Sequence, residues 1–65
     1  MVIANGEQVA VPAGAHLTDL LAALGLGEKW VVAERNGDPV DRADMAATVL
    51  EDGDRIELVR AVAGG

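Results

Sequence analysis

Residues 15–27 read AHLTDLLAALGLG, and this stretch predicts the helix around which the rest of the chain must fold. Its apolar residues recur at positions i, i+3, i+4 and i+7, the spacing of side chains that share one face of an α-helix. The four leucines with this spacing are Leu17, Leu20, Leu21 and Leu24. A helix with one apolar face must bury it against another element, and here that element is one face of a sheet.

The two ends of this helix carry separate signals. Thr18 is the better N-cap by residue type, whereas His16 has the capping-box spacing to Asp19, so the sequence leaves the choice between them open. Asp19 also lies in the first turn, where the helix dipole favours an anion. At the other end, Gly25 suits the left-handed C′ position, from which Leu26 folds back onto the helix in a Schellman motif.

Two Asn-Gly pairs, at residues 5–6 and 36–37, predict tight turns, because both positions of such a turn need a positive φ angle. The strands beside these turns are expected at residues 1–4, 7–11, 30–35 and 38–40. Pro39 cannot donate a ladder hydrogen bond, which places its strand at an edge of the sheet.

A last strand is expected near the end of the chain. It follows a loop with a helical turn at 41–48 and a tight turn at 51–54, and it occupies residues 55–62. Alternation along the strand puts Ile56 and Leu58 on one face. The opposite face carries Glu57 and Val59, so we expect Val59 to point away from the helix.

Together these elements predict an α+β protein with the β-grasp fold of ubiquitin-like domains. A helical crossover returns a later strand parallel to an earlier one, so the sheet should be mixed. We expect four or five strands with one main helix packed across one face. The β-grasp domain is assigned to residues 1–60 and a flexible tail to residues 61–65.

The composition excludes several classes of function. The chain has 65 residues, a formal net charge of −6 and no cysteine, which rules out disulfides, a thiolate nucleophile and a cysteine metal site. Its five basic residues are scattered, unlike the basic stripe of nucleic-acid binders. No apolar run approaches the roughly 20 residues of a membrane span, and the N-terminus lacks a signal-peptide pattern. We therefore expect a cytoplasmic protein that binds neither nucleic acid nor membranes.

No ordinary catalytic set can be found among the side chains, so we expect no enzymatic activity, no cofactor and no metal ion. His16 is the only histidine and lies at the predicted start of the helix, and the chain contains no serine. Thr18 and Thr48 have no plausible base beside them. Asp52 and Asp54 flank a glycine, which is typical of a turn and not of a catalytic carboxylate pair.

The segment AVAGG, residues 61–65, is the remaining candidate for chemistry. Its α-carboxylate needs no pocket inside this protein, because a partner enzyme can activate it in a narrow channel. Glycine at the last two positions, Gly64 and Gly65, removes side chains that would collide with such a channel and restrict the backbone. The five residues reach roughly 17 Å when extended. We expect docking contacts from the apolar residues that precede the glycines, namely Val59, Ala61 and Val62.

Three motifs carry a resemblance to a known family. They are NGDPVDR at residues 36–42, LEDGDRIEL at 50–58 and AVAGG at 61–65. With these motifs and its helix segment, the chain resembles the thiamine-biosynthesis sulfur carrier proteins, small prokaryotic relatives of ubiquitin, over essentially its whole length. Two residues depart from the family's pattern. His16 stands where Thr or Ser commonly caps the helix, and Arg35 stands where an apolar residue is more usual.

The resemblance implies a specific chemistry at the terminal glycines. In the family, an adenylating enzyme similar to ubiquitin-activating enzymes uses ATP to convert the terminal carboxylate to an acyl-adenylate. Sulfur from a persulfide donor then replaces the adenylate, and the resulting thiocarboxylate gives its sulfur to thiazole synthase. By this resemblance, Gly65 bears the sulfur and Gly64 provides clearance.

Three alternatives stay open at this point. The first is a sulfur carrier for another pathway, such as molybdopterin, cysteine or natural-product synthesis. The second is a protein modifier that forms isopeptide bonds, and the third is a non-catalytic acidic β-grasp binding module with an inert tail. Every sulfur carrier uses the same terminal group, so the residues alone do not identify the pathway.

Overall fold

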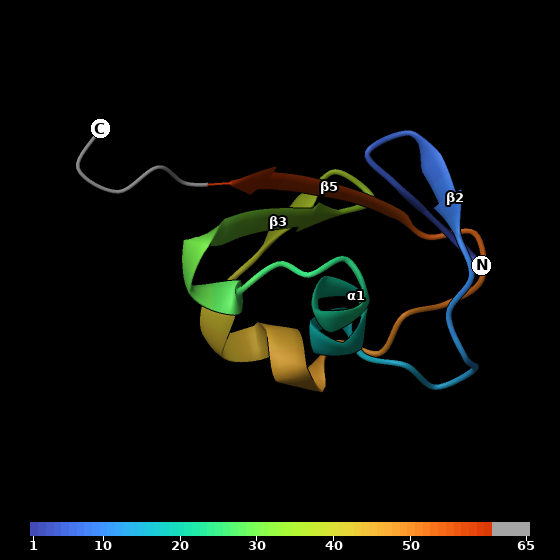
Figure 1. The fold of residues 1–65 in the computed structure, drawn as a ribbon, viewed down its shortest axis with the longest axis horizontal. Helices are drawn as coiled ribbons and strands as arrows, with labels where there is room; N and C mark the ends of the chain where they lie inside the picture. Colours follow the sequence, from blue (N-terminus) through green and yellow to red (C-terminus); the bar gives the residue numbers. More distant parts are fainter. Residues whose placement is uncertain (61–65) are drawn as a thin grey trace.

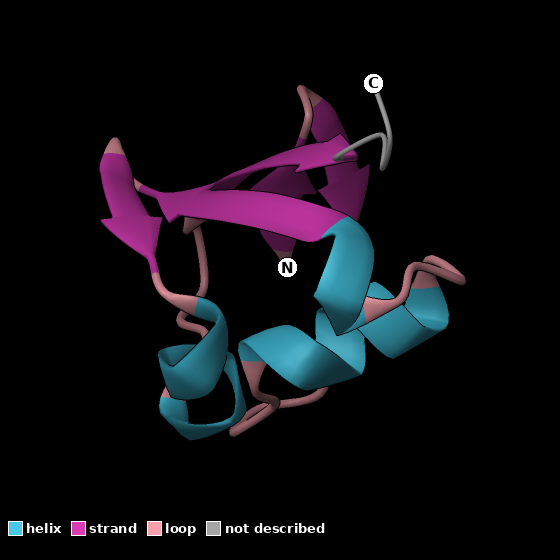
Figure 2. Cartoon of the chain, turned by 90° about the vertical axis from the view of Figure 1, so that its left-hand side faces the viewer, coloured by secondary structure: helices cyan, strands magenta, loops and turns pink. Residues whose placement is uncertain are grey.

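The computed structural model describes residues 1–60, which form five β-strands, one α-helix and two short 3₁₀ helices (Figure 1). The strands are β1 (Val2–Ala4), β2 (Glu7–Val9), β3 (Val31–Arg35), β4 (Asp38–Val40) and β5 (Arg55–Arg60). The helical segments are α1 (Leu17–Ala23), η1 (Glu28–Trp30) and η2 (Arg42–Ala47). All three helical segments lie on one side of the sheet (Figure 2), so within residues 1–60 its other face is free of helices.

Strand β5 lies at the centre of the sheet, whose order is β2-β1-β5-β3-β4. It pairs in parallel with β1 and antiparallel with β3, while β2 and β4 complete two antiparallel hairpins at the edges. This mixed five-stranded sheet with one main helix confirms the predicted β-grasp fold. The described chain therefore ends, at Arg60, in the central strand of the sheet.

Both Asn-Gly turns form as predicted. Their φ angles are 50° and 83° in the first turn and 51° and 87° in the second, the left-handed region that this turn type needs. The strand after the first turn is shorter than expected, because Val9 already pairs with Val2, the first residue of β1. Pro39 lies in the edge strand β4, where its missing N–H group leaves no ladder bond unmade.

The hydrophobic core lies between α1 and the inner face of the sheet. Leu17, Leu20 and Leu21 of the helix are fully buried, and Ile56 and Leu58 of β5 belong to the same cluster. The cluster is completed by Val2, Ala4, Val31, Ala33, Met45 and Leu50. Burying a leucine of this kind contributes about 1.5–3 kcal/mol, so the helix stripe supplies much of the stability of so short a chain.

The helix ends settle the N-cap question and confirm the C-terminal motif. His16 is the N-cap, with extended backbone angles, and its N–H group donates to the Asp19 carboxylate at 2.8 Å. At the C-terminal end, Gly25 has a φ angle of 71°. The N–H group of Leu26 donates to the Leu21 carbonyl at 2.8 Å, the long hydrogen bond of a Schellman motif.

Two sequence expectations were wrong in this region. Leu24 is 40% exposed although its spacing predicts the buried face, because α1 ends at Ala23 and Leu24 is the C-cap residue. Trp30 lies outside the sheet, because residues 28–30 form η1 and the strand begins at Val31. The helical turn expected within 41–48 is present as η2.

Two expectations concern residues after Arg60. The last strand was expected at 55–62, and the structure describes it as β5, from Arg55 to Arg60. Residues 61 and 62 of that strand, and the flexible tail expected at residues 61–65, lie outside the described residues.

Candidate docking surface

Two exposed valines lie side by side on the free face of the sheet. The alternation of β5 buries Ile56 and Leu58 and turns Val59 to the opposite face, as the sequence predicts. Val59 is the direct cross-strand partner of Val32 on β3, and the two residues are 63% and 56% exposed. We call Val32 and Val59 the valine pair. A single exposed valine is ordinary, but two in register make a continuous apolar spot next to the end of the central strand.

An acidic pair lies next to the valine pair on the same face. Glu34 of β3 is directly opposite Glu57 of β5, and both side chains are exposed. Like charges in this position repel each other and destabilise the sheet. The ion pairs found within residues 1–60 include neither glutamate. Sequence reasoning placed Glu57 on this face but missed Glu34, because the register between β3 and β5 cannot be read from either strand alone.

Two asparagine side chains hold β5 from both sides. The Nδ2 group of Asn5 donates to the Leu58 carbonyl at 3.2 Å, and its Oδ1 accepts from the Leu58 N–H group at 2.8 Å. On the other side, Oδ1 of Asn36 accepts from the Arg55 N–H group at 2.9 Å. These carboxamides imitate the peptide groups of a neighbouring strand, so the first residue of each Asn-Gly turn also fixes the central strand. The sequence assigned both residues to turns alone.

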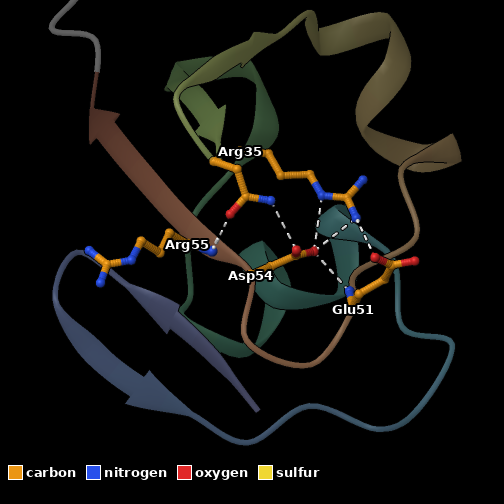
Figure 3. A network of polar contacts seen from close by, with 5 residues as sticks. Arg35, Glu51, Asp54 and Arg55 are labelled. Atoms are coloured by element: carbon orange, nitrogen blue, oxygen red, sulfur yellow. Dashed lines mark hydrogen bonds and ion pairs between the residues drawn. The ribbon is translucent and has the colours of Figure 1, made fainter.

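The carboxylate of Asp54 is the centre of a polar network directly before β5 (Figure 3). This residue is only 6% exposed. Its Oδ2 accepts from Nε and Nη2 of Arg35, each at 2.9 Å, and from the Glu51 N–H group at 2.8 Å. Its Oδ1 accepts from Nδ2 of Asn36 at 3.0 Å. One carboxylate thus joins the 51–54 turn to the second hairpin.

The surroundings of Asp54 lower the pKa of its carboxyl group. Burial by itself raises this pKa, but hydrogen bonds from Glu51, Asn36 and Arg35, together with the positive charge of Arg35, stabilise the anion and outweigh it. The carboxylate therefore has the structural role that the turn interpretation predicts. The ion pair also accounts for the charged side chain of Arg35 at the end of β3.

The structure also bears on the possible metal site, a membrane span and the predicted site residues. Within residues 1–60, no group of three or more His, Cys, Asp or Glu side chains is placed to hold a metal ion. No helix in the described part of the chain is long and apolar enough to cross a membrane. Of the predicted site residues, Val59 is described, and its docking role stays a prediction. Those that lie outside the described residues are Ala61, Val62, Gly64 and Gly65.

Comparison with protein families gives one match that covers nearly the whole chain. The ThiS family matches residues 2–65. Among curated proteins, a thiazole synthase of Magnetococcus marinus is 41% identical over 61 residues, which are 94% of this chain and 19% of that protein. A thiazole synthase of Paramagnetospirillum magneticum is 33% identical over 64 residues, 98% of this chain and 20% of that protein. The chain thus spans about a fifth of the length of these relatives.

Solved structures of one relative share the fold. The crystal structure of the thiamine biosynthesis protein ThiS from Geobacter metallireducens matches with a TM-score of 0.79 and 31% identity, covering 98% of this chain and 97% of that one. A solution structure of a thiamine biosynthesis protein from the same organism matches with a TM-score of 0.78 and 31% identity, covering 98% of this chain and 86% of that one.

Proposed function

The chain belongs to the ThiS family of thiamine-biosynthesis sulfur carriers, and on that premise we propose that the carboxylate of Gly65 carries sulfur as a thiocarboxylate. The observation that carries this proposal is the family match over residues 2–65, which runs through both terminal glycines. The protein acts in this proposal as a carrier whose acyl group is processed by partners, and it supplies no catalytic side chain of its own.

The proposed reaction takes place at the carbonyl carbon of Gly65. A partner enzyme first joins the carboxylate to the AMP portion of ATP and releases pyrophosphate. AMP is a far better leaving group than oxide, and the partner can stabilise the charge that develops on the acyl oxygen. The outer sulfur of a persulfide donor then attacks the carbonyl carbon and displaces AMP, which gives an acyl disulfide. A second thiol of the partner proteins cleaves its S–S bond, which releases the thiocarboxylate and leaves a disulfide on the partner. Gly64 leaves room for this chemistry, because a side chain there would widen the segment that enters the partner.

The valine pair supports a docking role for the free sheet face. Val59 precedes Gly65 by six positions, so a partner that contacts Val59 can hold the carboxylate up to roughly 20 Å away. The body of the carrier would remain outside the partner's active site, with the acidic residues of the sheet face steering the approach. We also propose that Ala61 and Val62 extend this contact toward the glycines.

Thiazole synthase is the proposed acceptor of the sulfur. Two proteins with that name include a segment similar to this chain, at 41% and 33% identity. The presence of a similar segment in the same polypeptide as a thiazole synthase supports a role in thiazole formation. It favours that role over the other sulfur-carrier pathways. The adenylating enzyme and the persulfide donor enter the proposal from the resemblance to the sulfur carrier family.

The experiment that tests the proposal measures ATP–pyrophosphate exchange with the cognate adenylating enzyme. Deletion of Gly65 or the substitution Gly64→Val should reduce exchange at least tenfold, because valine adds width and restricts the backbone. Ala10→Val is the matched control, because it adds the same branched side chain at an exposed position just after β2. Full exchange in Gly64→Val would contradict the proposed entry of the tail into a narrow channel.

A further inference from the structure

The cationic side chains of this acidic protein are unevenly placed. The chain has five Lys and Arg residues against eleven Asp and Glu residues. Arg35 is bound to Asp54, and Arg55 begins β5 at the end far from residue 60. The other three cations, Lys29, Arg42 and Arg60, lie near the end of β5, where Arg60 pairs with Val31 and Arg42 contacts Lys29. Figure 1 shows η1, in green, at this same end of the molecule.

Contacts join these cations to the only aromatic residue of the chain. Nζ of Lys29 lies 5.3 Å from the centre of the Trp30 ring, and Nη1 of Arg42 donates to the Lys29 carbonyl at 3.5 Å. Arg60 is the cross-strand partner of Val31, the residue after Trp30. We call Lys29, Trp30, Arg42 and Arg60 the cationic end. Trp30 is 45% exposed, and tryptophan and arginine are the residues most enriched at the energetic centres of protein interfaces.

The cations of the cationic end form no ion pairs within residues 1–60. The ion pairs found within residues 1–60 involve Met1, His16 and Arg35 as cations, and none involves Lys29, Arg42 or Arg60. Glu28 and Asp41 are the nearby acids, and they line the hollows around Trp30 and Arg42. The two hollows are thus lined by two cations, Lys29 and Arg42, and two carboxylates, whereas the whole chain has an excess of six negative charges.

A hollow with an apolar lining adjoins the cationic end, between β3, β4 and the start of η2. Its apolar wall is formed by Val31, Ala33, Pro39, Val40 and Met45. Lys29 and Arg42 also line it, and so does Val32 of the valine pair. Val32 therefore links the hollow to the proposed docking face. The lining combines an apolar wall with two cations and the single carboxylate of Asp41.

We propose that this hollow and the cationic end receive an acidic segment of the partner protein that takes up residues 61–65. An apolar side chain of that segment fills the hollow, and flanking carboxylates bind Lys29, Arg42 and Arg60. A partner that binds the residues after Arg60 is held near this surface, because Arg60 ends β5 directly beside Val31. The inference rests on the proposed function, in which that partner is the adenylating enzyme.

The test compares two variants that each place a glutamate on the surface, in binding to the purified adenylating enzyme. Arg42→Glu should raise the dissociation constant at least tenfold at low salt and reduce its dependence on salt concentration. Ala22→Glu, the control at an exposed position of α1 away from the free sheet face, should change it less than twofold. In the same titration, 5-fluorotryptophan at position 30, the only tryptophan, should give a ¹⁹F resonance that shifts or broadens when the enzyme is added.

Each outcome decides the inference separately from the proposed function. Equal weakening by both variants, or an unchanged fluorine signal on saturation, overturns the inference even when the unmodified carrier is adenylated normally. If the carrier binds the enzyme but never receives sulfur, the proposed function fails, and the comparison of the two glutamate variants still tests the docking surface. Absence of any binding by the unmodified carrier overturns both. Circular dichroism of each variant confirms that it is folded before binding is compared.

Discussion

Asp54 shows how one side chain determines the start of the central strand. Its carboxylate receives the Arg35 guanidinium, the Asn36 carboxamide and the Glu51 N–H group, all within 3.0 Å. A buried carboxylate is unfavourable without such partners, and with them it ties the 51–54 turn to β3 and its hairpin. Asp54 therefore stabilises the base of β5, and the valine pair lies farther along the same strand.

The first prediction concerns the substitution Asp54→Asn. It should reduce the free energy of unfolding at pH 7 by about 1–3 kcal/mol, because the bond to Arg35 loses its charge and one oxygen becomes a donor. The folded protein lowers the pKa of Asp54, so this stability is present above the ordinary pKa of 3.8 and is lost as pH falls through the folded-state pKa. Urea melts of both proteins at pH 7 and near pH 3 measure the effect. A difference that stays the same at both pH values would contradict the assignment.

The strand β5 is the element in which the sequence was most informative. Its two-residue alternation predicted which side chains face the helix, because the buried and the exposed sets differ sharply in polarity. The leucine spacing likewise predicted α1, and Gly25 at the C′ position predicted its end. Neither showed that the C-cap residue Leu24 is partly exposed. The Asn-Gly pairs predicted both turns, whereas the bonds from Asn5 to Leu58 depend on packing between segments 53 positions apart.

The second prediction concerns the free face of β5. Val59→Asp should weaken binding to the adenylating enzyme at least tenfold, or about 1.4 kcal/mol, because it replaces an apolar contact of the docking face with a carboxylate that the partner would have to desolvate. The change in unfolding free energy should stay within about 0.5 kcal/mol, since residue 59 is mostly exposed. Val49→Asp is the matched control, because Val49 is 45% exposed and lies outside the sheet. A large fall in melting temperature for Val59→Asp would contradict the assignment of the strand's faces.

At the scale of the whole molecule, the two proposed docking surfaces are adjacent to each other. The free sheet face carries the valine pair and the acidic pair, and the cationic end adjoins it where β5 ends. The sequence predicted the fold and Val59, but its five basic residues were interpreted as scattered. Only the fold brings Lys29, Arg42 and Arg60 together, because η1, η2 and β5 are far apart in the sequence. For the same reason, the sequence could not reveal the hollow beside them.

The central claim is that Gly65 bears the sulfur, and mass spectrometry of the reacted chain tests it most directly. The protein is incubated with ATP, its adenylating enzyme, a persulfide donor and a thiol that cleaves the acyl disulfide, and then fragmented. The account predicts the mass increase of one sulfur replacing one oxygen, confined to fragments that contain Gly65, and no increase when ATP is omitted. An unchanged mass with an enzyme shown to be active, or sulfur located on any fragment without Gly65, would contradict the claim.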